Sequence, residues 1–99
     1  MAHDVIKLDY PKAEEMRKTF KAGSQQIEAT LKEMQNIANT LQEGALLGEG
    51  GSKFVEAIRT KLCPSLVKLK AKYDEMDKDV AAAVSSMKQR DAESATKFR

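Results

Sequence analysis

Residue types that carry catalytic or metal chemistry are sparse in this chain. His3 is the only histidine and Cys63 the only cysteine, and they are far apart in the sequence. A cysteine acts as a nucleophile when a neighbouring base or cation favours its thiolate. Cys63 instead falls beside an apolar stripe, so we expect a buried structural cysteine. No group of Cys, His and carboxylates has metal-ligand spacing. The segment Gly48-Glu49-Gly50-Gly51 precedes a predicted helix, where phosphate can bind, but no P-loop Lys-Ser/Thr follows. We therefore expect no enzyme, no catalytic residue, no cofactor and no metal ion.

Tyr73 and Asp77 are four residues apart and share one face of the second predicted helix. On structure alone, this spacing is typical of a core tyrosine with its hydroxyl at the rim, followed by a solvated aspartate.

The elements that position this pair are predicted by the apolar spacing. Between residues 13 and 41, small or apolar residues recur at steps of three and four: Ala13, Met16, Phe20, Gly23, Ile27, Thr30, Met34, Ile37 and Leu41. Such spacing is typical of a helix that packs in a left-handed supercoil. A second segment repeats it, through Phe54 or Val55, Ile58, Leu62, Leu66, Leu69, Tyr73, Met76, Val80, Ala83 and Met87. The glycine-rich stretch between them predicts a turn. The expected fold class is all-α, an antiparallel helix-turn-helix hairpin.

Local signals place the boundaries within a single domain, 1–99. We expect helix one over about 11–42, a turn over about 43–51, helix two over about 52–88 and a frayed tail over 89–99. Pro11 suits a first helical turn, Gly44 suits a C-terminal stop, and Ser52 suits an N-cap. Pro64 lacks the N–H that would bond the carbonyl of Thr60, so a kink is expected near Pro64.

Composition excludes some classes of partner. The net charge is +2, from 17 basic and 15 acidic residues, which is too balanced to predict a nucleic-acid-binding protein. No stretch approaches the roughly 20 apolar residues that span a bilayer, so no integral membrane segment is expected. Residues 1–7 lack the apolar core of a Sec signal peptide.

Both apolar stripes are wider than a two-helix contact needs. Leu31 and Ala38 flank the first stripe, and Val55, Cys63 and Val67 flank the second. This breadth favours a four-helix bundle built by dimerisation of two hairpins. The predicted dimer interface is Phe20, Ile27, Met34, Ile37, Leu41, Ile58, Leu62, Leu66, Leu69 and Met76. The basic stretch Lys61, Lys68, Lys70 and Lys72 and the acidic stretch Asp74, Glu75, Asp77 and Asp79 would match between antiparallel copies. Scattered surface apolar residues are the other interpretation, and the partner is either a second copy or a related small helical protein.

The chain resembles the WXG-hundred family, the ESAT-six-like small proteins exported by type VII secretion systems. The resemblance covers roughly residues 5 to 90 and rests on length, two long helices, Leu46-Leu47-Gly48 at the turn, and Tyr73 with Asp77. Leu46 stands where the family has its signature tryptophan, so the turn motif here is Leu46 and Gly48. The resemblance implies that Tyr73 and Asp77 form an export signal.

The function expected from the resemblance is a dimeric secreted interaction protein or export adaptor. It would leave the cytoplasm without a Sec signal peptide, after docking to a secretion ATPase. The alternative is a cytoplasmic helical adaptor or chaperone that pairs with a different small helical protein. A membrane-surface role would also suit the Met, Ala and Lys content of the helices, but bundle packing explains the same pattern.

Overall fold

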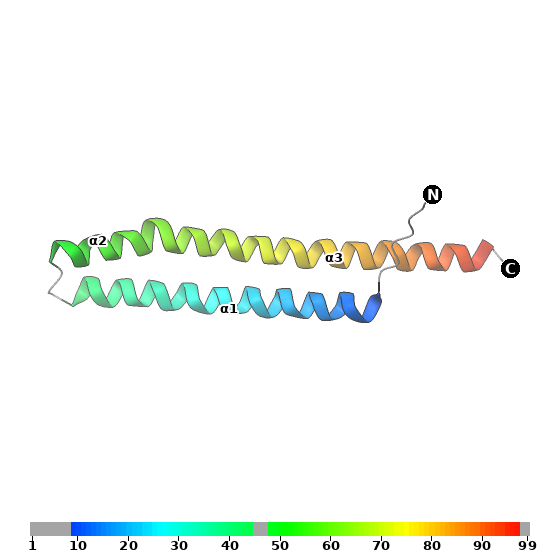
Figure 1. Ribbon diagram of the computed structural model, residues 1–99, viewed down its shortest axis with the longest axis horizontal. Coiled ribbons are helices and arrows are strands. Elements are labelled where there is room, and N and C mark those ends of the chain that lie inside the picture. The colour runs from blue at the N-terminus through cyan, green and yellow to red at the C-terminus, as the bar shows by residue number, and fades with distance from the viewer. Residues whose placement is uncertain (1–8, 45–47, 98–99) are drawn as a thin grey trace.

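The computed structural model describes residues 9–44 and 48–97, with the side chains of residues 9–44 and 48–93. Helix α1 (Tyr10–Glu43) runs antiparallel to a second rod made of α2 (Glu49–Ala57), the π-helix η1 (Ile58–Leu62) and α3 (Cys63–Lys97) (Figure 1). No strand occurs in the described ranges. The predicted all-α helical hairpin is confirmed.

The ends of α1 are formed by local capping. The side chain of Asp9 accepts a hydrogen bond from the backbone N–H of Lys12 at 3.2 Å, and proline lies in the first turn. At the other end, the N–H of Gly44 donates to the carbonyl of Thr40 at 2.9 Å. These capping bonds supply partners for backbone amides and carbonyls that the regular helical pattern leaves unpaired at the helix ends.

The second rod begins and ends differently from expectation. Gly48 precedes α2 with an extended backbone, so the helix begins at Glu49 and Ser52 lies inside it rather than at its N-cap. Glu49 places negative charge at the positive end of the helix dipole. At the other end, α3 continues to Lys97 instead of fraying from residue 89. The Tyr10 hydroxyl donates a hydrogen bond to Asp91, which ties this last part of α3 to the start of α1.

A π turn, rather than a simple kink, precedes Pro64. Pro64 has no N–H for an α-helical bond, and the N–H of Cys63 donates to the carbonyl of Ile58, five residues back. The wider turn adds one residue to the helical repeat. Ile58 and Cys63 are therefore both buried, whereas Leu62, which the spacing predicts to face inward, is 40% exposed.

The core between the two rods is thin. Its buried members are mostly small: Ala13, Ser24, Leu31, Ala38, Val55, Ile58, Cys63 and Val84. The radius of gyration is 21.9 Å, against about 13 Å for a compact domain of this length. The accessible surface is 7690 Å², against roughly 5,600 Å² for a compact protein of this mass. The hairpin is therefore elongated and exposes more surface than a compact domain, including large apolar side chains such as Met16 and Leu69.

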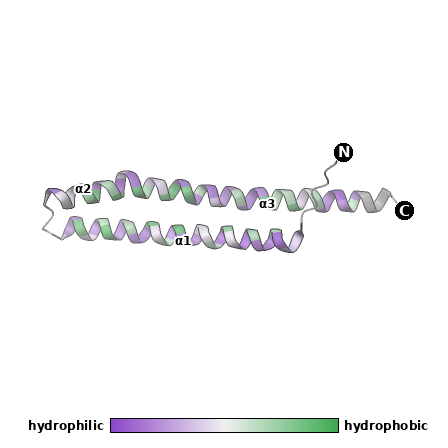
Figure 2. Ribbon diagram, in the orientation of Figure 1, coloured by the Kyte–Doolittle hydropathy of each residue, from purple (hydrophilic) through white to green (hydrophobic). Residues whose placement is uncertain are grey.

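The contact face of α1 is rotated from the predicted stripe. Ser24, Leu31 and Ala38 are buried against the second rod, whereas Met16 and Ile37 are 48% and 41% exposed. Small side chains at the contact allow the two helices to approach closely. The larger apolar side chains of the predicted stripe lie to one side of that contact, and Figure 2 shows hydrophobic residues recurring along both rods.

Candidate functional site

One side of the helix contact is closed by polar side chains. Arg17 Nε donates to Asp77 Oδ1 at 2.9 Å. Ser24 Oγ donates to Asp74 Oδ1 at 2.6 Å, and Lys70 Nζ donates to Asp74 Oδ2 at 3.0 Å. Further along, Arg59 Nη2 donates to Asn39 Oδ1 and to Gln42 Oε1, both at 2.8 Å. We call this set of bonds the polar seam.

The hydrogen bonds of the polar seam favour the ionised forms of its acidic and basic side chains. The hydrogen bond from Ser24, followed by that from Lys70, lowers the pKa of Asp74. The same bond to Asp74 raises the pKa of Lys70, and the bond to Asp77 raises the pKa of Arg17. Charged groups that already have partners offer little to an apolar ligand, because burying them would remove their remaining water.

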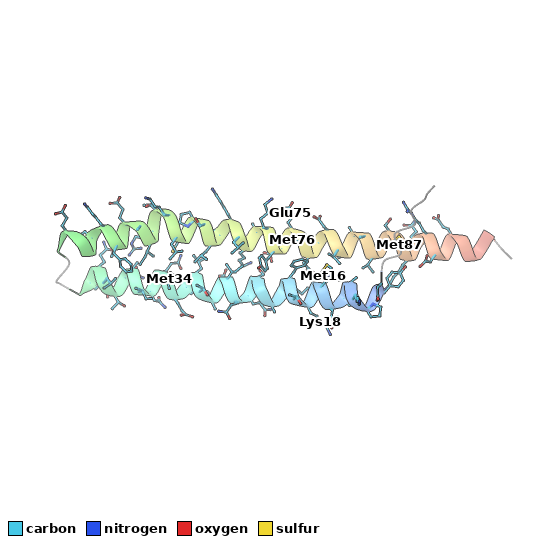
Figure 3. All side chains as sticks on the ribbon, viewed as in Figure 1. Met16, Lys18, Met34, Glu75, Met76 and Met87 are labelled. Carbon is cyan, nitrogen blue, oxygen red and sulfur yellow. The ribbon has the colours of Figure 1, made fainter. Side chains whose placement is uncertain are left out.

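The other side of the contact is apolar and exposed. Its large exposed side chains are Met16, Ile37, Phe54, Leu62, Leu69 and Met76, which we call the apolar face. Half-buried neighbours extend it: Phe20, Ile27, Met34, Leu41, Leu66, Tyr73, Val80 and Met87. Figure 3 shows Met16, Met34, Met76 and Met87 along the junction of the two rods, with Lys18 and Glu75 pointing away from it.

Contacts across the hairpin show that these residues share one side. Leu62, Leu69 and Met76 follow one another at steps of seven, which gives a single line along a supercoiled helix. Gly23 lies on the corresponding line of α1, which runs from Met16 to Ile37, and it contacts Tyr73. Ser24 and Arg17, on the neighbouring line, contact the polar seam instead. The apolar face and the polar seam are thus opposite sides of the hairpin.

Val67 is the exception among the exposed apolar side chains. It is 52% exposed, but it lies two residues before Leu69, which places it about 200° away around the helix. Val67 is therefore on the side of the polar seam.

Tyr73 packs at the closest approach of the two rods. Its ring lies edge-on to Phe20, with centroids 6.0 Å apart and planes at 85°. A Cβ added at Gly23 would lie 2.6 Å from Tyr73 Cδ2. Gly23 is required here because the ring occupies the space of a side chain. This contact agrees with the interpretation of Tyr73 as a core tyrosine.

The predicted export-signal pair lies in the middle of the hairpin and makes contacts within the chain. Tyr73 contacts α1, and the Asp77 side chain is 14% exposed in its ion pair with Arg17. Tyr73 follows Gly48 by 25 residues, which is about 38 Å along the helix axis. Gly48 is exposed next to the turn, and Leu46 lies outside the described residues. The structure therefore does not bring Tyr73 and Gly48 together within one chain.

The predicted interface residues fall into three groups. Ile37, Leu62, Leu69 and Met76 are exposed on the apolar face. Phe20, Ile27, Met34, Leu41 and Leu66 are half-buried beside it. Ile58 is 3% exposed and is already buried within the hairpin, because the π turn directs it to α1. Ile58 therefore has almost no surface to offer a partner.

Sequence reasoning missed two parts of this arrangement. Met16 was expected to face inward and is exposed on the apolar face. Of the two alternatives Phe54 and Val55, Val55 is the buried one and Phe54 is exposed. The polar seam was not foreseen. The sequence signal for it was Ser24, a polar residue on the same line of the helix as Leu31 and Ala38, because the three follow one another at steps of seven residues.

Other chemistry finds little support among the described residues. Cys63 is 8% exposed within the apolar core. In residues 9–44 and 48–97, no group of three or more His, Cys, Asp and Glu side chains could hold a metal ion. None of the helices there is both long and apolar enough to cross a bilayer.

The comparisons with known proteins give one family. No curated protein and no solved structure matches the chain. The model of the WXG100 family, described as proteins of 100 residues with WXG, matches residues 5–92. With nearly the whole chain matched and a helical hairpin as its fold, this protein belongs to the WXG100 family.

Proposed function

We propose that this chain is exported by a type VII secretion system without a Sec signal peptide. In this proposal it acts as a dimeric secreted interaction protein or export adaptor rather than as an enzyme. Family membership over residues 5–92 supports export. The observation that carries the interaction role is the apolar face, where six large apolar side chains are exposed on one side of the hairpin.

Burial of that face is the physical basis of the interaction. Each Leu or Met removed from water contributes about 1.5–3 kcal/mol. In residues 9–44 and 48–97 no further helix covers this side, whereas the opposite side has the polar seam. A second helical hairpin laid on the apolar face would complete a four-helix bundle.

Tyr73 and Asp77 remain the proposed export signal, but the contacts of both within the chain set conditions on that role. A secretion ATPase that takes the tyrosine ring into an apolar pocket would have to draw it from its contact with Gly23. It would also compete with Arg17 for the carboxylate of Asp77. Docking would then be coupled to local opening of the hairpin at this level.

Paired substitutions separate an export signal from a structural ion pair. Asp77→Asn and Arg17→Gln both remove the ion pair between Arg17 and Asp77, but only Asp77→Asn removes the carboxylate. The assay is secretion of tagged chain by cells that carry a type VII system, with intracellular amount and thermal midpoint measured in parallel. We expect Asp77→Asn to stop export and Arg17→Gln to leave it at the level of the unchanged protein. Equal loss in both variants would show that fold stability, rather than a signal, controls export.

Tyr73→Phe tests the ring in the same assay. The ring, and its packing on Gly23, is kept, so a signal that uses the aromatic ring tolerates this change. Tyr73→Ala is a poor test, because it removes the packing on Gly23 and Phe20. Retention of the unchanged protein in the cytoplasm, despite an active type VII system, would favour the cytoplasmic adaptor instead.

A further inference from the structure

We propose that the side of the hairpin opposite the apolar face carries a second docking surface, which binds an acidic helical segment of another protein. Its residues are Arg59, Cys63 and Val67 on the second rod and Leu31 on α1, and we call it the seam gap. This inference depends neither on export nor on a hairpin that covers the apolar face.

The polar seam is interrupted in the middle of the hairpin. Its bonds join α1 to the second rod at Ser24 and next at Asn39 and Gln42. Ser24 and Asn39 are 15 residues apart, or about 22 Å along the helix axis. Over that length, no hydrogen bond or ion pair between side chains of the described residues joins the two rods. The buried core reaches this level through Leu31 and Cys63, so its edge has no polar cover there.

Val67 extends the apolar edge to the surface. It follows Cys63 by four residues, so the two lie on one face of α3. Val67 is 52% exposed, and it is the one member of the exposed large apolar residues in the described ranges that lies on this side. A hairpin laid on the apolar face would therefore leave Val67 in water.

The π turn determines where Arg59 lies. In a regular α-helix, Arg59 would lie on the same face as the buried Cys63, four residues later, and would face α1. The π turn instead bonds the N–H of Cys63 to the carbonyl of Ile58. Ile58 is buried as a result, and Arg59 is exposed at the edge of the contact. Single π turns within α-helices occur frequently at functional sites.

The charge of Arg59 is oriented but not neutralised. Its Nη2 donates to Asn39 Oδ1 and Gln42 Oε1, which are both neutral amide oxygens. None of the ion pairs among the described residues includes Arg59. The Nε and Nη1 groups also carry N–H donors. A guanidinium held in this way is suited to a carboxylate, with which it forms short, strong hydrogen bonds.

The other end of the seam gap already contains carboxylates. Lys70 is paired there with Asp74, and Glu28 is close enough to raise the pKa of Lys70. The acidic group of the partner therefore belongs at the Arg59 end, and an apolar side chain belongs over Val67.

Spacing and backbone chemistry favour a helical partner. Arg59 and Val67 are eight residues apart, or about 12 Å along the axis. A helix presents a carboxylate and an apolar side chain seven or eight residues apart on one face, about 10–12 Å from each other. An extended peptide would need backbone partners, such as a sheet edge provides, and the helices around Val67 use their own backbone groups internally.

Selection from a peptide-display library tests this proposal. Helix-forming peptides of about 16 residues, or about four turns, are selected on the purified chain, and peptides that also bind Val67→Gln are removed. We expect the enriched peptides to share an aspartate or glutamate seven or eight residues from a large apolar residue. Fluorescence anisotropy of labelled peptides then gives the dissociation constants, and circular dichroism confirms that each variant is helical.

Variants of the chain and of the peptide isolate the contact with Arg59. Arg59→Gln should weaken binding at least about fivefold. Lys18→Gln, which removes a charge that points away from the junction of the rods (Figure 3), should leave it unchanged. Arg59→Gln also removes the bonds to α1, so a change in the peptide supplies a control that leaves the chain intact. Replacing the acidic residue of the peptide by its amide should weaken binding to the unchanged chain by the same factor and have no effect on binding to Arg59→Gln.

The possible failures are distinguishable. If no peptide distinguishes the unchanged chain from Val67→Gln, the seam gap is not a docking surface. Enriched peptides that lack an acidic residue, or that bind Arg59→Gln equally well, would overturn the chemistry assigned to the partner. Assemblies of the purified chain larger than a dimer, lost in Val67→Gln, would show that another copy occupies the seam gap instead. A chain that stays monomeric and still binds the acidic peptides would refute the proposed function and leave this inference intact.

Discussion

Gly23→Ala should reverse the usual effect of replacing a helical glycine. Within a helix, alanine is more favourable than glycine by about 1 kcal/mol. At this position the new Cβ would lie 2.6 Å from Tyr73 Cδ2, so the ring has to move. Phe20, edge-on to the same ring, restricts that movement. Overpacking of this kind costs about 1–3 kcal/mol, so the steric cost should exceed the gain and the net effect should be destabilising by up to about 2 kcal/mol.

A double-mutant cycle isolates the steric cost. In a Tyr73→Ala background the ring is absent, and Gly23→Ala should then stabilise by about 1 kcal/mol. Ala22→Gly, at the exposed neighbouring position, supplies the matched measure of helix propensity and should destabilise by a similar amount.

Thermal unfolding followed by circular dichroism measures all these variants, at one protein concentration because the proposed association would contribute to stability. For a chain of this size, 1 kcal/mol corresponds to roughly 4–8 °C in midpoint. The midpoint should fall for Gly23→Ala in the unchanged protein and rise for the same substitution beside Tyr73→Ala. A rise in both backgrounds would refute the close contact between Gly23 and Tyr73.

Three further predictions concern the polar seam, Cys63 and the charged halves of α3. The hydrogen bonds from Ser24 and Lys70 hold the pKa of Asp74 below the usual value of 3.8 for an aspartate. These bonds therefore stabilise the fold at pH values above 3.8, and this contribution is lost as the pH falls through the lower, folded-state pKa. Ser24→Ala should therefore lower the thermal midpoint more at pH 7 than at pH 2; an equal change at both values would count against the charged bond. Cys63 is buried, so a thiol reagent should label the native protein much more slowly than the urea-unfolded protein, and equal rates would contradict its burial. The dissociation constant of the dimer should rise with salt concentration, since opposite charges between copies are screened; a constant value would exclude the charge matching.

The fold was predictable because its signals are local and repeated. The three-four spacing predicts the two rods, and glycines mark the turn. The rotation of the contact face was not predictable from spacing, because the predicted stripe and its flank are both apolar enough to face the second rod. Small residues such as Ser24 and Ala38 determine which face of α1 contacts the second rod, because they allow the two helices to approach closely. The extra residue of the π turn was also not predicted. Pro64 indicates that the helix is disturbed, but it does not indicate how the backbone accommodates the disturbance.

The exposed apolar face was predictable in kind and less so in detail, and its role as an interface stays a prediction. Excess apolar breadth predicts an interaction surface, and most of the predicted residues are exposed or half-buried on one side. The prediction that Ile58 lies in the dimer interface was wrong, because the π turn directs its side chain toward α1. The resemblance implies that Tyr73 and Asp77 form an export signal, yet the sequence carries no information about Gly23 and Arg17 on the other rod, which contact them.

The central claim is that another hairpin covers the apolar face, and sedimentation equilibrium of the purified chain tests it most directly. The account predicts twice the chain mass of 11.0 kDa at micromolar concentration. Leu69→Gln should raise the dissociation constant more than about tenfold, whereas Val67→Gln, on the opposite side, should change it by less than about threefold. A purified chain that is a stable, fully helical monomer at high concentration, in the absence of any other hairpin, would contradict the account.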